Sequence, residues 1–160
     1  MSIVYATEAA LCESARQAAV SWLESRVWPL VVGLEGGLGA GKTTWVRAML
    51  RGLGYSARVP SPTFTLLEHY EIGTLTVVHL DLYRLADAGE LEFLGIRDWL
   101  ERPNVWLLVE WPERGGRFAE SVDLTLELEI LPDEQRELTA VARTAAGREV
   151  VSRWLGQDIK

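Results

Sequence analysis

The chain has 160 residues, of which 48% are hydrophobic and 24% charged, the balance of a soluble globular protein with one buried core. Its formal net charge of −7 argues against direct, unaided binding to nucleic acid, which depends on basic residues that neutralise phosphates. No stretch reaches the roughly 18 apolar residues of a membrane span, and Cys12 is a lone cysteine, which excludes an internal disulfide. We therefore expect a cytoplasmic protein with no membrane partner, folded as a single domain over residues 1–160.

The first third of the chain predicts a helix, a strand and a second helix. Thr7 is a suitable N-cap for apolar residues that recur at helical spacing up to position 23. Pro29 precedes an apolar run over 30–35, which is typical of a buried strand. A glycine-rich segment follows, and residues 44–53 then favour a helix that ends at Gly52 or Gly54.

The middle of the chain predicts a loop, three strands and a helix. Residues 56–62 form the loop, and residues 63–70 and 74–80 are expected to be strands around a turn at 71–73. The helix is expected over 90–100. Residues 105–109 are all apolar, as in a central strand that is covered on both faces.

The C-terminal part alternates apolar and polar residues over 122–130, which predicts a half-exposed strand. A turn at 132–134 and a returning strand over 136–143 complete a hairpin, and a short helix is expected over 148–155. Together these elements predict an α/β fold with a mixed central sheet, helices on its faces and a C-terminal β-hairpin.

The glycine-rich segment has the spacing of a phosphate-binding P-loop, Gly36-x-x-x-x-Gly41-Lys42-Thr43, between a predicted strand and a predicted helix. Glycines let successive N–H groups point at phosphate oxygens, and the helix N-terminus adds partial positive charge. Lys42 would supply a cation to the β- and γ-phosphates, and the Thr43 hydroxyl would bind Mg²⁺. We therefore expect a P-loop fold that binds a magnesium–nucleoside triphosphate.

The nucleotide is expected to be ATP rather than GTP. Guanine-specific sites of the GTPase kind use an Asn-Lys-x-Asp segment. Lysine occurs only at positions 42 and 160, so the chain has no such segment.

Two acidic residues follow apolar runs that are expected to be strands. Asp81 ends 77–81 and Glu110 ends 106–110, and the carboxyl ends of strands in an open α/β sheet face the ligand. Either acid could hold the hydration shell of magnesium, or be a plain strand-end carboxylate. Thr63, in a proline-flanked loop, fits a switch residue that senses the γ-phosphate, or a simple turn residue.

Two further residues lie next to these acids in the sequence. His79 is expected on the same strand face as Asp81, as a packed or hydrogen-bonded histidine rather than a ligand. Trp111 directly follows Glu110 and is expected either in the core or beside the site.

Four segments in this order resemble the bacterial TsaE (YjeE) family of tRNA-modification ATPases. They are Glu35-Gly36-Gly37-Leu38-Gly39-Ala40-Gly41-Lys42-Thr43-Thr44, Ser61-Pro62-Thr63-Phe64-Thr65-Leu66, His79-Leu80-Asp81-Leu82-Tyr83-Arg84-Leu85 and Glu110-Trp111-Pro112-Glu113. The stretch 90–95 is also similar to the family, and the match spans about residues 30–115. Gly37 departs from the aspartate that is commoner in the family, at a position that offers mainly its backbone to the phosphates.

The resemblance implies a role in forming threonylcarbamoyladenosine beside the anticodon of tRNAs that read codons beginning with A. It implies a slow ATPase, dependent on ATP and Mg²⁺, that acts with TsaD-like and TsaB-like proteins and resets their complex between turnovers. Contact with tRNA would then be only indirect, through the partners, which agrees with the acidic net charge.

The resemblance also implies roles by position. Metal binding falls to Thr43, Glu110 and Asp81, the last as the Walker B-like acid, with Thr63 as switch residue and Trp111 as an activity-linked neighbour. The catalytic set is thus Lys42, Thr63, Asp81, Glu110 and Trp111. The nucleotide would be held by Gly39, Ala40, Gly41, Lys42, Thr43 and Thr44, and also touched by Thr7 and Arg136.

Two other function classes stay open at this point. A P-loop small-molecule kinase of similar length is the main alternative, and Arg114 or Arg117 could then serve on a lid over the phosphates. A nucleotide-sensing scaffold without hydrolysis is the other.

Overall fold

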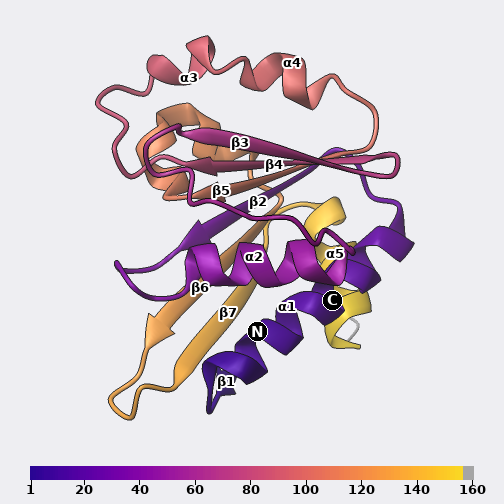
Figure 1. The fold of residues 1–160 in the computed structure, drawn as a ribbon, viewed down its shortest axis with the longest axis vertical. Coiled ribbons are helices and arrows are strands. Elements are labelled where there is room, and N and C mark those ends of the chain that lie inside the picture. Colours follow the sequence, from indigo (N-terminus) through magenta and orange to yellow (C-terminus); the bar gives the residue numbers. More distant parts are fainter. Residues whose placement is uncertain (157–160) are drawn as a thin grey trace.

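The structure is a computed structural model that describes residues 1–156. It contains a seven-stranded sheet in the order β1-β7-β6-β2-β5-β4-β3 (Figure 1). The strands are β1 (Ser2–Tyr5), β2 (Leu30–Glu35), β3 (Leu67–Ile72), β4 (Leu75–Asp81), β5 (Val105–Glu110), β6 (Leu124–Ile130) and β7 (Arg136–Ala142). Strands β6, β2, β5 and β4 run parallel, and the outer pairs are antiparallel. The predicted mixed sheet and C-terminal hairpin are confirmed.

Helices cover both faces of the sheet. The helices α1 (Glu8–Ser25), α2 (Lys42–Gly52) and α5 (Ala145–Leu155) pack on one face. The short helices α3 (Glu90–Phe93) and α4 (Ile96–Leu100), with the 3₁₀ segment η1 (Pro112–Ser121), lie on the other (Figure 1). No helix in the described range 1–156 is both long enough and apolar enough to cross a membrane.

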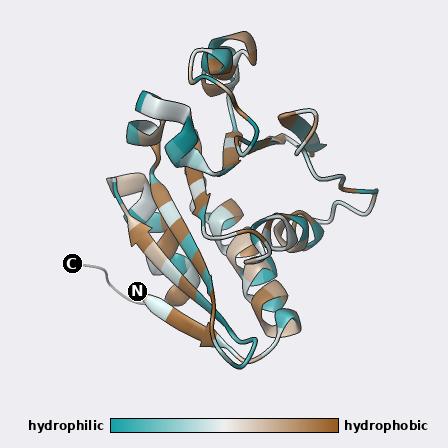
Figure 2. Ribbon diagram, turned by 90° about the vertical axis from the view of Figure 1, so that its left-hand side faces the viewer, coloured by the Kyte–Doolittle hydropathy of each residue, from teal (hydrophilic) through white to brown (hydrophobic). Residues whose placement is uncertain are grey.

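The core follows from the alternation of side chains along the central strands. On β2, Leu30, Val32 and Leu34 face the layer of α1, α2 and α5, whereas Val31 faces α3 and α4. All six residues of β5 are buried, which confirms the prediction of a central strand covered on both faces. Figure 2 shows apolar and polar residues alternating along the outer strands as well.

Three fully buried tryptophans fasten α1 and α2 to the sheet. The ring of Trp22 on α1 lies 5.7 Å from that of Trp45 on α2 and 6.1 Å from that of Trp106 on β5. Rings at this distance gain contact energy beyond the area that they bury. Because Trp45 lies in the first turn of α2, the cluster holds the end of the P-loop in place.

A threonine side chain caps the start of each of the helices α1 and α5. The Thr7 side chain accepts a hydrogen bond from the Ala10 N–H at 3.2 Å, so α1 begins where predicted. Helix α5 begins at Ala145, three residues before the predicted start, because Thr144 caps it by accepting from the Gly147 N–H.

The strand prediction for 63–70 is wrong over its first four residues. Residues 63–66 form a turn in which the Leu66 N–H donates to the Pro62 carbonyl at 2.7 Å, and Leu66 has a φ of 64°. Because Leu66 is left-handed, it cannot belong to the strand, and pairing with β4 begins only at Leu67. The turn between β3 and β4 accordingly lies at Gly73 and Thr74, further on than predicted.

The predicted helix over 90–100 is two helices. Gly95 has a φ of 67°, which lies outside the helical range and separates α3 from α4. Strand β1 and segment η1 were not predicted. Strand β1 exists because it pairs with β7, with Ser2 opposite Thr139, and this pairing across the chain leaves no local signal.

Strand β6 is more covered than a half-exposed strand. Leu124, Leu126 and Leu128 are buried as predicted, but Thr125 on the other face is buried too, and Ile130 is 49% exposed.

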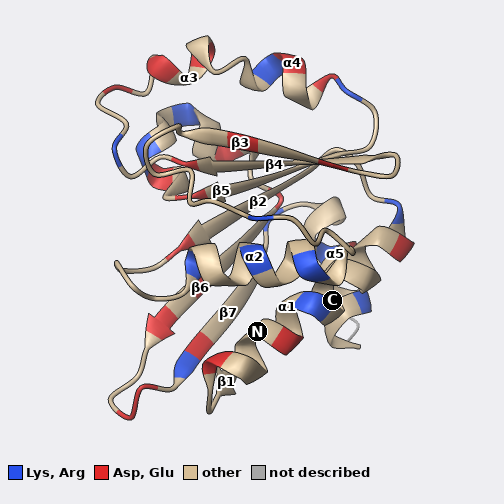
Figure 3. Cartoon of the chain, in the orientation of Figure 1, with Lys and Arg blue, Asp and Glu red and all other residues tan. Residues whose placement is uncertain are grey.

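Figure 3 shows basic residues scattered over several elements in this view of the described chain.

Candidate functional site

The P-loop lies between β2 and α2, and two glycines permit its path. Gly36 has a φ of 134° and Gly41 a φ of 109°, both in the region that favours glycine. A Cβ at Gly36 would also overlap the carbonyl oxygen of Leu128. Gly37 differs, because a Cβ there would meet nothing within 4 Å. The departure from the family at Gly37 therefore changes no packing.

Lys42 is buried at the start of α2, and its ammonium group caps the loop. Its Nζ donates to the carbonyl oxygens of Gly36 at 2.6 Å and Gly37 at 2.8 Å, and lies 4.2 Å from the centre of the Trp111 ring. Burial lowers the pKa of Lys42, while the nearby carboxylates of Glu110 and Asp81 oppose that shift. The cation is thus held by uncharged carbonyl acceptors, which a negatively charged phosphate could replace.

Glu110 ends β5 and receives two hydrogen bonds on one oxygen. Its Oε1 accepts from the Thr43 hydroxyl at 2.7 Å and is 2.7 Å from Nε2 of His79. His79 is fully buried, and its other ring nitrogen has no partner. The expected hydrogen-bonded histidine is therefore present, and it orients the carboxylate that faces Thr43.

Asp81 ends β4 and holds the loop that carries Thr63. Its Oδ2 accepts from the Thr63 hydroxyl at 3.1 Å, and its Oδ1 accepts from the Tyr83 N–H at 3.0 Å. The Thr63 hydroxyl is also 2.7 Å from that of Ser61. Asp81 and Glu110 are register partners on adjacent parallel strands, which brings the two hydroxyl–carboxylate pairs side by side.

These groups line one pocket of about 430 Å³ at the carboxyl ends of the parallel strands. The lining is Leu38, Gly39, Gly41, Lys42, Thr43, Thr44, Thr63, Asp81, Tyr83, Arg84, Glu110 and Trp111. The structure thus gathers the whole predicted catalytic set in one place. The roles assigned to these residues remain predictions, because proximity alone does not test them.

Trp111 lies at the rim of this pocket rather than in the core. Its backbone N–H donates to the Leu34 carbonyl at 3.1 Å, and its φ of 58° turns the chain sharply out of β5. Its ring is 5.1 Å from that of Tyr83, and the Arg114 guanidinium lies 5.0 Å from the Tyr83 ring. Of the two positions expected for Trp111, the structure has the one beside the site.

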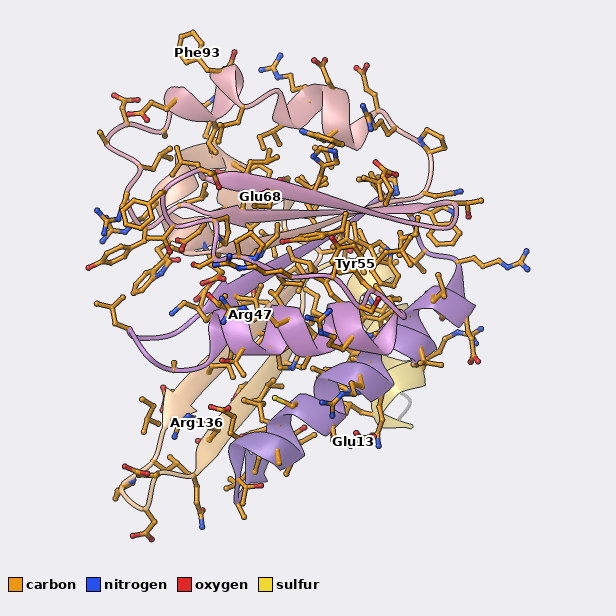
Figure 4. All side chains as sticks on the ribbon, in the orientation of Figure 1. Glu13, Arg47, Tyr55, Glu68, Phe93 and Arg136 are labelled. Carbon is orange, nitrogen blue, oxygen red and sulfur yellow. The ribbon has the colours of Figure 1, made fainter. Side chains whose placement is uncertain are left out.

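Thr7 and Arg136 do not line the pocket. Thr7 caps α1, and Arg136 pairs with Tyr5 across β1 and β7. The Arg136 guanidinium donates to the carbonyl of Glu134 at 2.6 Å, and Figure 4 shows the residue on the C-terminal hairpin. The nucleotide contacts predicted for Thr7 and Arg136 therefore stay predictions.

Two neighbours of the site, Ser61 and Tyr83, had no assigned role in the sequence analysis, whereas His79 was expected to be a packed or hydrogen-bonded residue. Ser61 and Tyr83 contact Thr63 and Asp81, and His79 contacts Glu110. The spacing of two that placed His79 on the strand face of Asp81 also reaches position 83, although Tyr83 lies beyond the end of β4.

A larger cavity of about 700 Å³ lies between α3, α4 and η1. Its lining includes Leu91, Ile96 and Phe118 but none of the P-loop residues. Of these two pockets the smaller is the better candidate site, because it combines the P-loop with converging carboxylates.

Comparison with known proteins gives the family. The model of the family described as threonylcarbamoyl adenosine biosynthesis protein TsaE matches residues 5–138. The chain belongs to the TsaE family. This family takes part in the biosynthesis of threonylcarbamoyladenosine in tRNA.

Relatives in two bacteria agree with this assignment. The tRNA threonylcarbamoyladenosine biosynthesis protein TsaE of Haemophilus influenzae is 42% identical over 123 residues, which cover 77% of each chain. The protein of that name from Bacillus subtilis is 38% identical over 112 residues, covering 70% of this chain and 69% of the relative. The crystal structure of Bacillus subtilis YdiB matches with a TM-score of 0.76 and 26% identity, over 98% of this chain and 94% of that one.

Proposed function

We propose that this TsaE-family chain binds ATP with Mg²⁺, hydrolyses it slowly by itself and drives TsaD-like and TsaB-like partners that form threonylcarbamoyladenosine in tRNA. One observation carries the proposal. The hydroxyl that would bind magnesium, on Thr43, already contacts the Glu110 carboxylate, inside a pocket that also holds Lys42, Thr63 and Asp81.

The donor set fits magnesium, which prefers oxygen ligands and keeps several waters. Within residues 1–156, no three His, Cys, Asp or Glu side chains are grouped so as to hold a metal ion. A magnesium ion would therefore take nucleotide phosphate oxygens and waters as its remaining ligands, next to Thr43, Glu110 and Asp81. In that position it would neutralise charge on the phosphates.

The protein side of hydrolysis consists of positioning and charge. Lys42 would exchange its two loop carbonyls for phosphate oxygens, which form stronger, charge-assisted bonds with it. Backbone N–H groups of the P-loop and of the N-terminus of α2 would donate hydrogen bonds to the same phosphate oxygens. Thr63 is close enough to Asp81 to respond to a change at the γ-phosphate.

The acidic charge of −7 favours an accessory role, because tRNA would have to be gripped by a partner protein. A small-molecule kinase is the second candidate. It is favoured by Arg114, whose guanidinium lies near Tyr83 and Trp111 at the rim of the pocket. Family membership weighs against the kinase.

The test is ATP consumption by the purified chain, alone and with purified TsaD-like and TsaB-like proteins and tRNA. We expect slow consumption alone, faster consumption with the partners, and modified tRNA only when all three proteins and ATP are present. A rate of ATP consumption that is the same with and without the partners, together with phosphate transfer to a metabolite, would favour the kinase. Full tRNA modification in the absence of any hydrolysis would favour the scaffold.

A further inference from the structure

The loop before β3 contains two linked hydroxyl groups, and the proposed roles do not use the first of them, that of Ser61. The Ser61 and Thr63 hydroxyls are 2.7 Å apart, and Thr63 donates to Oδ2 of Asp81 at 3.1 Å. A hydroxyl has one proton, and Thr63 gives its proton to a carboxylate that can only accept. The proton between the two hydroxyls therefore belongs to Ser61, which donates to Thr63.

The order of these bonds has a consequence for Thr63. A hydroxyl that accepts one hydrogen bond becomes a stronger donor, so Ser61 reinforces the bond from Thr63 to Asp81. It also restricts Thr63, because a side chain held at two points has fewer rotamers available. Ser61 and Thr63 are both only partly buried, so without such bonds water would compete for the Thr63 hydroxyl.

The backbone of the loop does not supply this restraint by itself. The loop is tied down at Leu66, whose N–H donates to Pro62 and whose carbonyl accepts from the Asp81 N–H at 3.0 Å. Between these ties the side chains of Phe64 and Thr65 are exposed. Thr63 lies between these ties, and its side-chain hydroxyl makes its hydrogen bonds with Ser61 and Asp81.

We propose that Ser61 is a positioning residue, which holds the Thr63 hydroxyl against Asp81 and so keeps the switch loop in register with the nucleotide pocket. This inference rests on the proposed function, because it assigns Ser61 a task in ATP hydrolysis. Ser61 does not line the pocket, so its effect is on turnover through Thr63 and not on nucleotide affinity.

The test compares Ser61→Ala, Ser61→Thr and Thr65→Ala with the wild type. Ser61→Thr keeps the donating hydroxyl. Thr65→Ala is the matched control, since it removes a hydroxyl from the same loop that donates to Glu68 instead, in an exposed hydrogen bond. For Ser61→Ala we expect kcat to fall about three- to tenfold, the effect of one hydrogen bond, with the ATP dissociation constant within about twofold of the wild type. Ser61→Thr and Thr65→Ala should both stay near the wild-type rate.

A second measurement needs no nucleotide. Amide hydrogen exchange in the peptide that spans 61–66 should be faster in Ser61→Ala than in the wild type, and unchanged in Ser61→Thr. An unaltered kcat and exchange rate in Ser61→Ala would overturn the inference. So would a Ser61→Thr variant as slow as Ser61→Ala, or a Thr65→Ala variant with the same loss. A wild type that neither binds nor hydrolyses ATP would refute the proposed function instead, and the exchange experiment would still test the hold on Thr63.

Discussion

Glu110 offers a substitution that separates charge from structure. In Glu110→Gln the remaining carbonyl oxygen can still accept from the Thr43 hydroxyl and from His79, both 2.7 Å from Oε1. The negative charge is lost, and with it the attraction for a magnesium ion. We expect ATP hydrolysis to fall at least about a hundredfold, which corresponds to the roughly 2.7 kcal/mol that one electrostatic contact can contribute to a transition state. The melting temperature should stay within about 2 °C of the wild type.

Glu110→Ala should lose activity and stability together. His79 is 0% exposed, and within residues 1–156 the acceptor for its Nε2 is Glu110, which the substitution removes. A buried unsatisfied donor costs about 1–3 kcal/mol, and the truncated side chain adds a cavity. For a chain of this size each kcal/mol lowers the melting temperature by about 2–4 °C, so the unsatisfied donor alone is expected to lower it by about 2–12 °C.

The assay is thermal unfolding by circular dichroism, with ATP turnover measured over a range of magnesium concentrations. The reasoning predicts that the two variants share the loss of turnover but differ in melting temperature. Equal melting temperatures would mean that His79 does not depend on Glu110. Turnover retained in Glu110→Gln would remove Glu110 from the candidate magnesium ligands.

Three further predictions follow from the P-loop and its surroundings. Lys42→Ala should weaken ATP binding about ten- to a hundredfold by calorimetry and abolish hydrolysis, with the fold intact. The control is Arg47→Ala, which removes a cation on the same helix that donates to the Val59 carbonyl, and this variant should bind ATP normally. Equal ATP affinities for Lys42→Ala and the wild type would contradict the role assigned to Lys42. Gly36→Ala should lower both the stability of the protein and its affinity for ATP, because the new Cβ overlaps the Leu128 carbonyl. Gly37→Ala is the control and should be tolerated. Similar midpoints of urea unfolding for the two variants would refute this prediction. Burial and the nearby carboxylates of Glu113 and Glu127 raise the pKa of Glu35, so its ionisation is disfavoured in the folded state. The stability that protonated Glu35 provides is therefore lost as the pH rises through its pKa in the folded protein. Glu35→Gln should therefore be more stable than the wild type at pH 7, with the difference shrinking as pH falls to about 4, and a difference that grows on acidification in urea titrations would contradict it.

The features that the sequence predicted correctly are those with a local signal. The P-loop spacing, the N-cap at Thr7 and the apolar run of β5 all depend on residues within a few positions of one another. The same holds for the placement of Asp81 and Glu110 at strand ends, which needs only the strand boundaries. The predictions failed where local patterns were overridden, as at Leu66 and Gly95, whose positive φ angles break the expected strand and helix.

The tertiary structure alone decided which side chains pair. Thr43 and Glu110 are 67 positions apart, and their hydrogen bond follows from the adjacent parallel strands β2 and β5. Strand β1 likewise exists only through its pairing with β7 at the far end of the chain. The sequence by itself therefore determined the P-loop and the two acidic residues that line the pocket with it, but it also predicted Thr7 and Arg136, which lie outside that lining. Which oxygen faces which hydroxyl depended on strand order and register, because these contacts join segments that no local pattern connects.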